Sequence, residues 1–105
     1  MDTIQAAIQQ IEKDIKDHSI ILYMKGDKMA PMCGFSGRVV QILSESGVEF
    51  ETRNVLEDDS LRQAIKEFSD WPTIPQLYVK GEFIGGCDIV TELFQSGELQ
   101  GILSK

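Results

Sequence analysis

The sequence predicts an α/β domain in which a mixed four-stranded sheet carries helices on both of its faces. The continuous apolar run at residues 20–24 is typical of a strand that is buried on both faces, as in a parallel sheet. Segments of helical periodicity stand before and after this run. Two further short strands enclose the turn at residues 80–82 and form a hairpin. With 105 residues the chain is long enough for one core, so we expect residues 1–105 to form a single domain.

The first half of the chain alternates helix and strand. A first helix is indicated by one apolar stripe with spacings of four, three and four, formed by Ile4, Ile8, Ile11 and Ile15. After the strand at 20–24, residues 25–32 contain Gly26 and Pro31 and are expected to form a loop. The next helix ends at Gly47 and is expected to turn four apolar side chains inward, which are Phe35, Val39, Ile42 and Leu43.

The middle of the chain continues this alternation. Residues 48–52 alternate strictly between apolar and polar, which predicts a strand with one solvated face near an edge of the sheet. The polar segment that follows offers three possible caps for another helix, namely Asp58, Asp59 and Ser60. That helix is expected to bury Leu61, Ile65 and Phe68. Residues 71–75 contain two prolines and are predicted to be irregular.

The last third supplies the hairpin and two helices. Strands are predicted at 76–79 and 83–84, and the glycine pair at 85–86 leads into a helix that Gly97 ends. A short final helix follows. The element order α-β-α-β-α-β-β-α-α combines one parallel pair, joined by a right-handed crossover, with an antiparallel hairpin. This arrangement is that of a thioredoxin-like fold.

Composition and charge exclude several function classes. Ten basic and seventeen acidic residues give a net charge of −7, which argues against nucleic-acid binding. No stretch approaches the ~20 apolar residues of a membrane span, and the N-terminus resembles neither a signal peptide nor a transit peptide. We therefore expect a cytoplasmic protein or, alternatively, one that acts in an organelle matrix after removal of a presequence. Two cysteines are too few for a disulfide scaffold and favour a reducing compartment.

Cys33 is the principal candidate for chemistry, because it stands between a strand and the start of a helix. Unpaired backbone amides at a helix N-terminus favour an anion and lower the pKa of a thiol below its free value of ~8.5. Gly34 allows another backbone to approach, and Phe35 can shield one side of the sulfur. Ser36 cannot form a disulfide but can hydrogen-bond to the thiolate. The alternative, an inert buried cysteine, is less favoured by this position.

Two further segments carry candidate binding residues. Pro75 begins a strand, where its missing amide is tolerated, and base rates favour a trans peptide bond. Its functional interpretation is that it leaves the Ile74 backbone free to pair with a thiol peptide. Asp88 is either a helix N-cap or an acceptor for a ligand ammonium group. Cys87 is interpreted as a structural or secondary thiol, and a Cys33–Cys87 disulfide remains open.

Other polar residues carry weaker signals. Lys25 and Arg62 are each, taken alone, interpreted as solvated charges. Trp71 fits either a core residue or a lid. One histidine and two cysteines do not make a zinc site within one chain, and no phosphate-binding loop or hydrolase triad is present.

Three motifs together resemble those of the monothiol glutaredoxins: Cys33-Gly34-Phe35-Ser36, Trp71-Pro72-Thr73-Ile74-Pro75 and Gly85-Gly86-Cys87-Asp88. Their order and spacing match the short single-domain class over essentially the whole chain. The resemblance implies that glutathione binds beside Cys33, with its glycyl carboxylate held by Lys25 and Arg62. It also implies that Pro75 is cis, that the Ile74 backbone pairs with the cysteinyl unit, and that the Cys87 backbone and Asp88 hold the γ-glutamyl end.

The resemblance further implies a [2Fe–2S] cluster that bridges a homodimer. Such a cluster takes four thiolates, which two Cys33 side chains and two glutathione molecules would supply. The implied role is that of a carrier or scaffold, with BolA-type proteins and iron–sulfur acceptor proteins as partners. The alternative is a glutathione-dependent thiol–disulfide oxidoreductase acting through Cys33 alone. A third interpretation, an interaction module without chemistry, is disfavoured by the three intact motifs.

Overall fold

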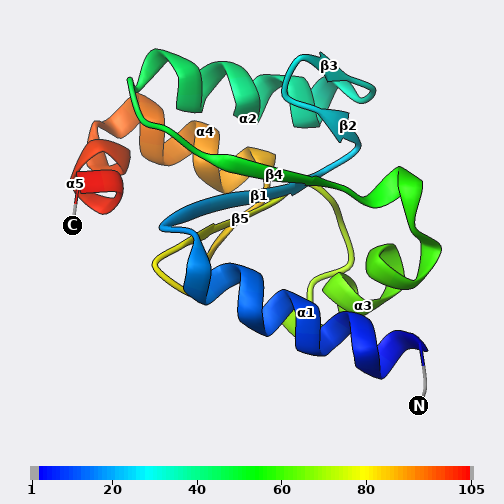
Figure 1. The fold of residues 1–105 in the computed structure, drawn as a ribbon. Coiled ribbons are helices and arrows are strands. Elements are labelled where there is room, and N and C mark those ends of the chain that lie inside the picture. The colour runs from blue at the N-terminus through cyan, green and yellow to red at the C-terminus, as the bar shows by residue number, and fades with distance from the viewer. Residues whose placement is uncertain (1–2, 105) are drawn as a thin grey trace.

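A computed structural model describes residues 3–104 of the chain and contains the four-stranded mixed sheet that the sequence predicts (Figure 1). Its strands are β1 (Ile20–Met24), β4 (Glu51–Asn54), β5 (Gln76–Val79) and β6 (Glu82–Gly85), in the spatial order β4-β1-β5-β6. β1 runs parallel to β4 and antiparallel to β5, and β5 pairs antiparallel with β6. The predicted parallel pair and the predicted hairpin are therefore both confirmed.

Helices cover both faces of this sheet. Helices α1 (Thr3–Asp17) and α3 (Asp59–Ser69) pack on one face, and α2 (Gly34–Glu45) and α4 (Cys87–Ser96) pack on the other (Figure 1). The short helix α5 (Glu98–Ser104) follows α4 and packs against it, and a 3₁₀ turn, η1 (Val55–Glu57), joins β4 to α3. Among residues 3–104, no helix is long and apolar enough to cross a membrane.

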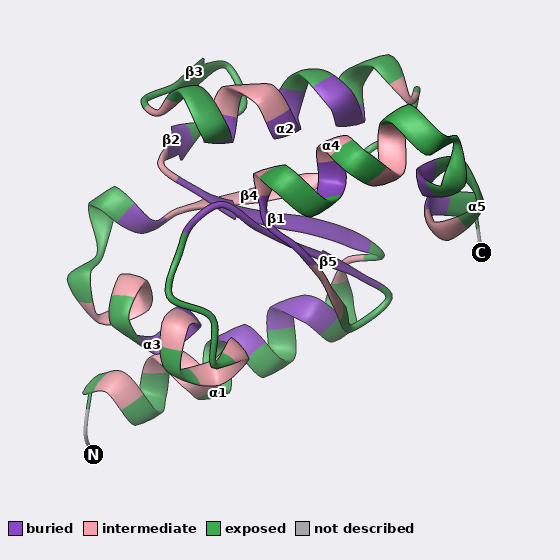
Figure 2. Ribbon diagram, turned by 180° about the vertical axis from the view of Figure 1, so that it is seen from behind, coloured by how far each residue is buried: buried purple, intermediate pink, exposed green. Residues whose placement is uncertain are grey.

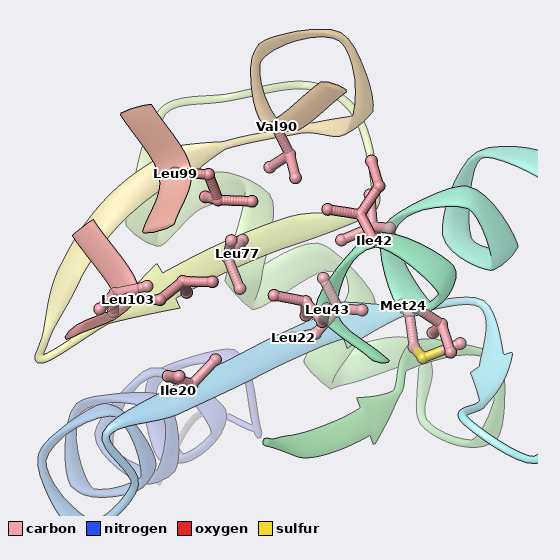
Figure 3. Packing of buried hydrophobic residues seen from close by; sticks show 12 residues of the cluster. Ile20, Leu22, Met24, Ile42, Leu43, Leu77, Val90, Leu99 and Leu103 are labelled. Carbon is pink, nitrogen blue, oxygen red and sulfur yellow. The ribbon is translucent and has the colours of Figure 1, made fainter. Parts of the chain in front are cut away.

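The core lies in two layers that share the sheet, and the buried strands run between them (Figure 2). β1 is buried along its whole length, as its apolar run predicts. Because side chains alternate along a strand, Leu22 faces the cluster under α2 and α4, whereas Tyr23 faces the cluster under α1 and α3. Figure 3 shows Leu22 beside Leu43 of α2 in the first of these clusters.

Two predictions about residues 25–35 are wrong. Residues 25–32 are not a plain loop, because β2 (Gly26–Asp27) and β3 (Ala30–Pro31) pair as a small antiparallel ribbon. The carboxylate of Asp27 stabilises its tip by accepting hydrogen bonds from the Met29 and Ala30 amides, both at 2.9 Å. Phe35 is not buried but 63% exposed, because it lies on the first turn of α2, where it faces a groove rather than the core.

The strand predicted at 48–52 begins later than expected. β4 spans Glu51–Asn54 because its register with β1 pairs Ile21 with Glu51 and Met24 with Asn54. Its position at an edge of the sheet is confirmed. Of the three possible caps of α3, Asp58 is the one used, and its carboxylate accepts hydrogen bonds from the amides of Ser60 and Leu61. Gly47 and Gly97 follow α2 and α4 with positive φ angles of 74° and 83°, as their predicted role as helix stops requires.

Candidate functional site

A groove of about 440 Å³ opens beside the start of α2, past the end of β1. Its volume falls within the range of about 300–1,000 Å³ that is typical of small-molecule sites. Four segments line it: the β1–β2 junction, the first turn of α2, residues 66–75, and the first turn of α4. The residues are Lys25, Cys33, Phe35, Lys66, Trp71, Pro72, Thr73, Ile74, Pro75, Gly86, Cys87, Asp88 and Ile89. The groove therefore brings together seven of the eight candidate residues.

Cys33 is the N-cap residue of α2, and its thiol is only partly buried. The pKa of this thiol is lowered, chiefly because the backbone amide of Ser36 donates a hydrogen bond to the sulfur. Partial burial raises it against this effect, while the Phe35 amide, the positive charge of Lys25 and the Ser36 hydroxyl lower it further. The N-terminal amides of its own helix thus favour the thiolate form of this accessible sulfur.

The ribbon before Cys33 is fixed at its base by three hydrogen bonds. The Lys25 amide donates to Ser36 Oγ at 3.1 Å, and the Gly26 amide donates to Asn54 Oδ1 at 2.9 Å. The Met32 amide donates to the Lys25 carbonyl at 3.0 Å. Gly26 has a φ of +88°, and a Cβ atom there would lie 2.6 Å from the Ala30 carbonyl oxygen and from the Met32 amide nitrogen. Only glycine fits this turn, which sets the position of Cys33.

The β1–β2 junction and the first turn of α2 form one wall of the groove, and residues 71–75 form the second. The Ile74–Pro75 peptide bond is cis, as the family resemblance implies and in contrast to the trans form that base rates alone favour. The segment passes close to Gly86, where a Cβ atom would lie 3.1 Å from the Pro75 carbonyl oxygen and 3.7 Å from Trp71 Nε1. Glycine at position 86 therefore permits the two walls to approach each other.

The third wall is the start of α4. The N-cap of this helix is Gly86, so the N-cap interpretation of Asp88 is wrong. Asp88 instead lies exposed in the first helical turn and lines the groove. Cys87 lines the same groove, and both cysteines are free thiols. The Cys87 sulfur lies 3.9 Å from Thr91 Oγ1.

The cations of the groove are Lys25 and Lys66, among the residues that the structure describes. Arg62 does not line it. The Arg62 side chain belongs to the first turn of α3, four residues before Lys66, so the two share one face of that helix. Sequence reasoning missed Lys66, and the four-residue spacing from Arg62 is the signal that would have found it. Trp71, whose sequence context fits either a core residue or a lid, lines the groove, and its ring centroid lies 6.0 Å from that of Phe83.

Within residues 3–104, no three or more His, Cys, Asp or Glu side chains gather as metal ligands would. A metal centre at Cys33 would therefore need ligands from other molecules.

Comparison with known proteins identifies the family. The glutaredoxin family model matches residues 20–84. A protein named monothiol glutaredoxin 2, from Rickettsia conorii, is 59% identical over 93 residues, which cover 89% of this chain and 87% of the relative. The chain belongs to the monothiol glutaredoxin family.

Two further comparisons agree with this family. A monothiol glutaredoxin of Synechocystis sp. is 54% identical over 94 residues, covering 90% of this chain and 88% of the relative. The solution structure of reduced poplar apo GrxS14 has 49% identity and a TM-score of 0.86, and the match covers 99% of this chain and 95% of that one. The thioredoxin-like glutaredoxin fold expected from the sequence is thereby confirmed. As a glutaredoxin with Ser36 in its motif, this chain has one cysteine at the start of α2.

Proposed function

We propose that this monothiol glutaredoxin binds glutathione in the groove beside Cys33 and carries [2Fe–2S] clusters, each bridging two copies of the chain. The observation that carries the proposal is the lowered pKa of an accessible thiol that opens onto a groove of ligand-sized volume. The groove is lined by groups complementary to a peptide with two carboxylates and one ammonium group. A thiolate is also the form of cysteine that binds iron.

The charges of the groove suggest how the tripeptide would lie. Lys25 and Lys66 are suited to the glycyl carboxylate, with Arg62 contributing from the preceding turn of α3. Asp88 is suited to the ammonium group, and the first backbone amides of α4, starting at Cys87, to the γ-glutamyl carboxylate. The Ile74 backbone beside the cis Pro75 is the proposed partner of the cysteinyl unit, and Phe35 would cover one side of its sulfur.

A ligand count supports a shared cluster. A [2Fe–2S] cluster takes four thiolates, and the first turn of α2 offers one. Two chains and two glutathione thiols would complete the set, so we expect a homodimer when cluster is bound. Two of the four ligands would be exchangeable small molecules, which suits cargo that must be released. We also propose BolA-type proteins and iron–sulfur acceptor proteins as partners, by family resemblance.

Anaerobic reconstitution with iron, sulfide and glutathione tests the carrier role. We expect a coloured dimer, measured by its visible spectrum and its mass in solution. Cys33→Ser is expected to abolish cluster binding, whereas Cys87→Ser, a change of the same kind in the same groove, is expected to retain it. Equal loss in the two variants would show that the ligand is wrongly assigned, and a colourless monomer of the unaltered chain would contradict the carrier role.

Calorimetric titration with glutathione tests the clamp. Lys25→Ala, Lys66→Ala and Asp88→Asn are each expected to weaken binding about tenfold, because each removes a charge-assisted contact. The control is Lys16→Ala, an exposed lysine at the end of α1. Unchanged affinity in the groove variants would reject the proposed clamp.

The lowered pKa of Cys33 also favours a second candidate function, thiol–disulfide exchange with glutathione. The Cys33 thiolate would attack the glutathione sulfur of a glutathionylated protein, releasing that protein's thiolate and leaving a Cys33–glutathione disulfide. A glutathione thiolate would then attack this disulfide, releasing oxidised glutathione and restoring the Cys33 thiolate. Brisk turnover of a glutathionylated substrate by a chain that assembles no cluster would favour this enzyme over the carrier.

For its location we propose a reducing compartment, either the cytoplasm or an organelle matrix. The two free thiols of the chain support this proposal.

A further inference from the structure

We propose that Gln76 is the positioning residue of the groove, holding residues 71–73 in place from inside the core through its side-chain amide. The inference deepens the proposed glutathione site and rests on it for its functional consequence. Gln76 itself does not line the groove, so its effect would be exerted through the segment that does.

The side chain of Gln76 is fully buried, with 0% of the residue exposed. A buried amide is costly unless it is hydrogen-bonded, so its partners indicate why it is there. Its Nε2 donates to the Trp71 carbonyl at 3.2 Å and to the Thr73 carbonyl at 3.1 Å. Its Oε1 accepts a hydrogen bond from the Tyr78 hydroxyl at 3.1 Å. Both amide hydrogens are thus bonded to carbonyl groups of the groove wall. The amide oxygen is oriented by Tyr78, the next residue of β5 that faces the same side of the sheet.

Residues 71–75 need such an external support. Pro72 and Pro75 have no amide hydrogen to give, and the segment belongs to no helix or strand. Its carbonyl groups are therefore not paired by a regular ladder, and only side-chain donors can hold them in one place. The Gln76 amide supplies two of these hydrogen bonds from a single side chain.

The same segment is also tied to the end of α3. The Trp71 amide donates to Ser69 Oγ at 3.1 Å, and that hydroxyl donates to the Ile65 carbonyl at 2.9 Å. Trp71 is thus held at its amide by α3 and at its carbonyl by β5. Because Lys66 of α3 lines the groove as well, Gln76 helps to fix the distance between Lys66 and residues 71–75.

Trp71 is the chain's single tryptophan, so its fluorescence reports on this segment in the absence of any ligand. In Gln76→Met, which keeps the length of the side chain but removes both donors, we expect stronger quenching of Trp71 by acrylamide than in the unaltered protein. Gln100→Met, on an exposed face of α5, is the control for the chemical change. Ile42→Val, in the core cluster on the opposite face of the sheet, is the control for a general loss of stability. Unchanged quenching in Gln76→Met would overturn the inference.

The functional consequence is measured by glutathione titration of the same variants. We expect Gln76→Met to weaken binding about tenfold, because the wall is no longer preorganised. The pKa of Cys33 is expected to stay unchanged, since its hydrogen bonds come from α2. If the unaltered protein did not bind glutathione, the proposed function would fail, and the quenching result would still decide the role of Gln76.

Gln76→Glu provides a second test, which also serves if Gln76→Met does not fold. A protonated carboxyl group has one donor and can keep one of the two hydrogen bonds, whereas a carboxylate has none. Since burial raises the pKa of a carboxyl group, we expect quenching near the unaltered level at about pH 5 and stronger quenching toward about pH 9. Tyr78 keeps its proton throughout, because burial raises its pKa to about 12. Gln100→Glu, at the exposed position on α5, is the control. If quenching in Gln76→Glu changed with pH only as much as in Gln100→Glu, the inference would be contradicted.

Discussion

At the scale of single residues, the chemistry of the site depends on the hydrogen bonds that the Cys33 sulfur accepts. The Ser36 amide contributes most to lowering its pKa, and the Ser36 hydroxyl contributes a smaller share. Since the folded chain binds this proton less tightly than the unfolded chain, the thiolate stabilises the fold above the unfolded pKa. That contribution is lost as the pH falls through the folded pKa.

Ser36→Ala is expected to raise the pKa of Cys33 toward its ordinary value without restoring it fully, because the backbone amides remain. The pH dependence of iodoacetamide alkylation, measured in a Cys87→Ser background so that one thiol reacts, reports the change. Ser44→Ala, at an exposed position of the same helix, is the control. An identical pKa in Ser36→Ala would mean that the hydroxyl contributes nothing.

Gly26 and Gly101 give opposite expectations for the same substitution. Gly26→Ala is expected to lower the free energy of unfolding by more than about 1 kcal/mol, because its positive φ and the two backbone atoms at 2.6 Å oppose a Cβ atom. Gly101→Ala, within α5 and with no neighbouring atom in reach of its Cβ, is expected to raise it by up to about 1 kcal/mol. Urea denaturation measures both, and equal effects would contradict the steric explanation.

At the scale of elements, α3 matters because it carries Lys66 and the end that anchors Trp71. The helix begins where the Asp58 carboxylate accepts hydrogen bonds from the Ser60 and Leu61 amides at 2.9 and 3.2 Å. This cap satisfies two amides that no intrahelical carbonyl can reach.

Asp58→Ala is expected to lower the free energy of unfolding by about 1 kcal/mol, the usual cost of losing an N-cap. Asp59→Ala removes the same charge one residue later, inside the helix, and is the matched control. The comparison is made by urea denaturation. A loss as large in Asp59→Ala would assign the effect to charge near the helix N-terminus rather than to the cap.

At the scale of the whole molecule, the sheet separates two core clusters, and we expect both to unfold in one transition. β1 contributes Leu22 to one cluster and Tyr23 to the other, so damage to either layer is transmitted through the same strand. The groove lies where the two layers meet past the end of this strand, with walls from α2 and α4 on one side and from α3 on the other.

Leu22→Ala is expected to lower the free energy of unfolding by about 2–5 kcal/mol, as for other large-to-small core changes. Trp71 fluorescence and far-ultraviolet circular dichroism should shift together, because a small domain of this kind unfolds in one transition. Leu56→Ala, at a residue 42% exposed, is the control. Separate transitions for the two probes would show that the layers unfold independently.

The sequence by itself determined the five helices, the four strands of the sheet in outline and the position of the thiol. Apolar periodicity set the helices, the continuous run at 20–24 set the central strand, and the position of Cys33 at a helix start followed from these. A cap among Asp58, Asp59 and Ser60 and the stops at Gly47 and Gly97 were likewise available from local chemistry. Such features depend on neighbours within a few residues, which the sequence displays directly.

Only the tertiary structure decided the register of β4 and the exposure of Phe35. Each of these depends on atoms from distant parts of the chain. The same reason explains why Lys66 was missed. Lys66 reaches the groove because α3 passes beside it. The Trp71 and Thr73 carbonyl groups lie only five and three residues before Gln76, but apolar periodicity does not predict a hydrogen bond from a buried side-chain amide.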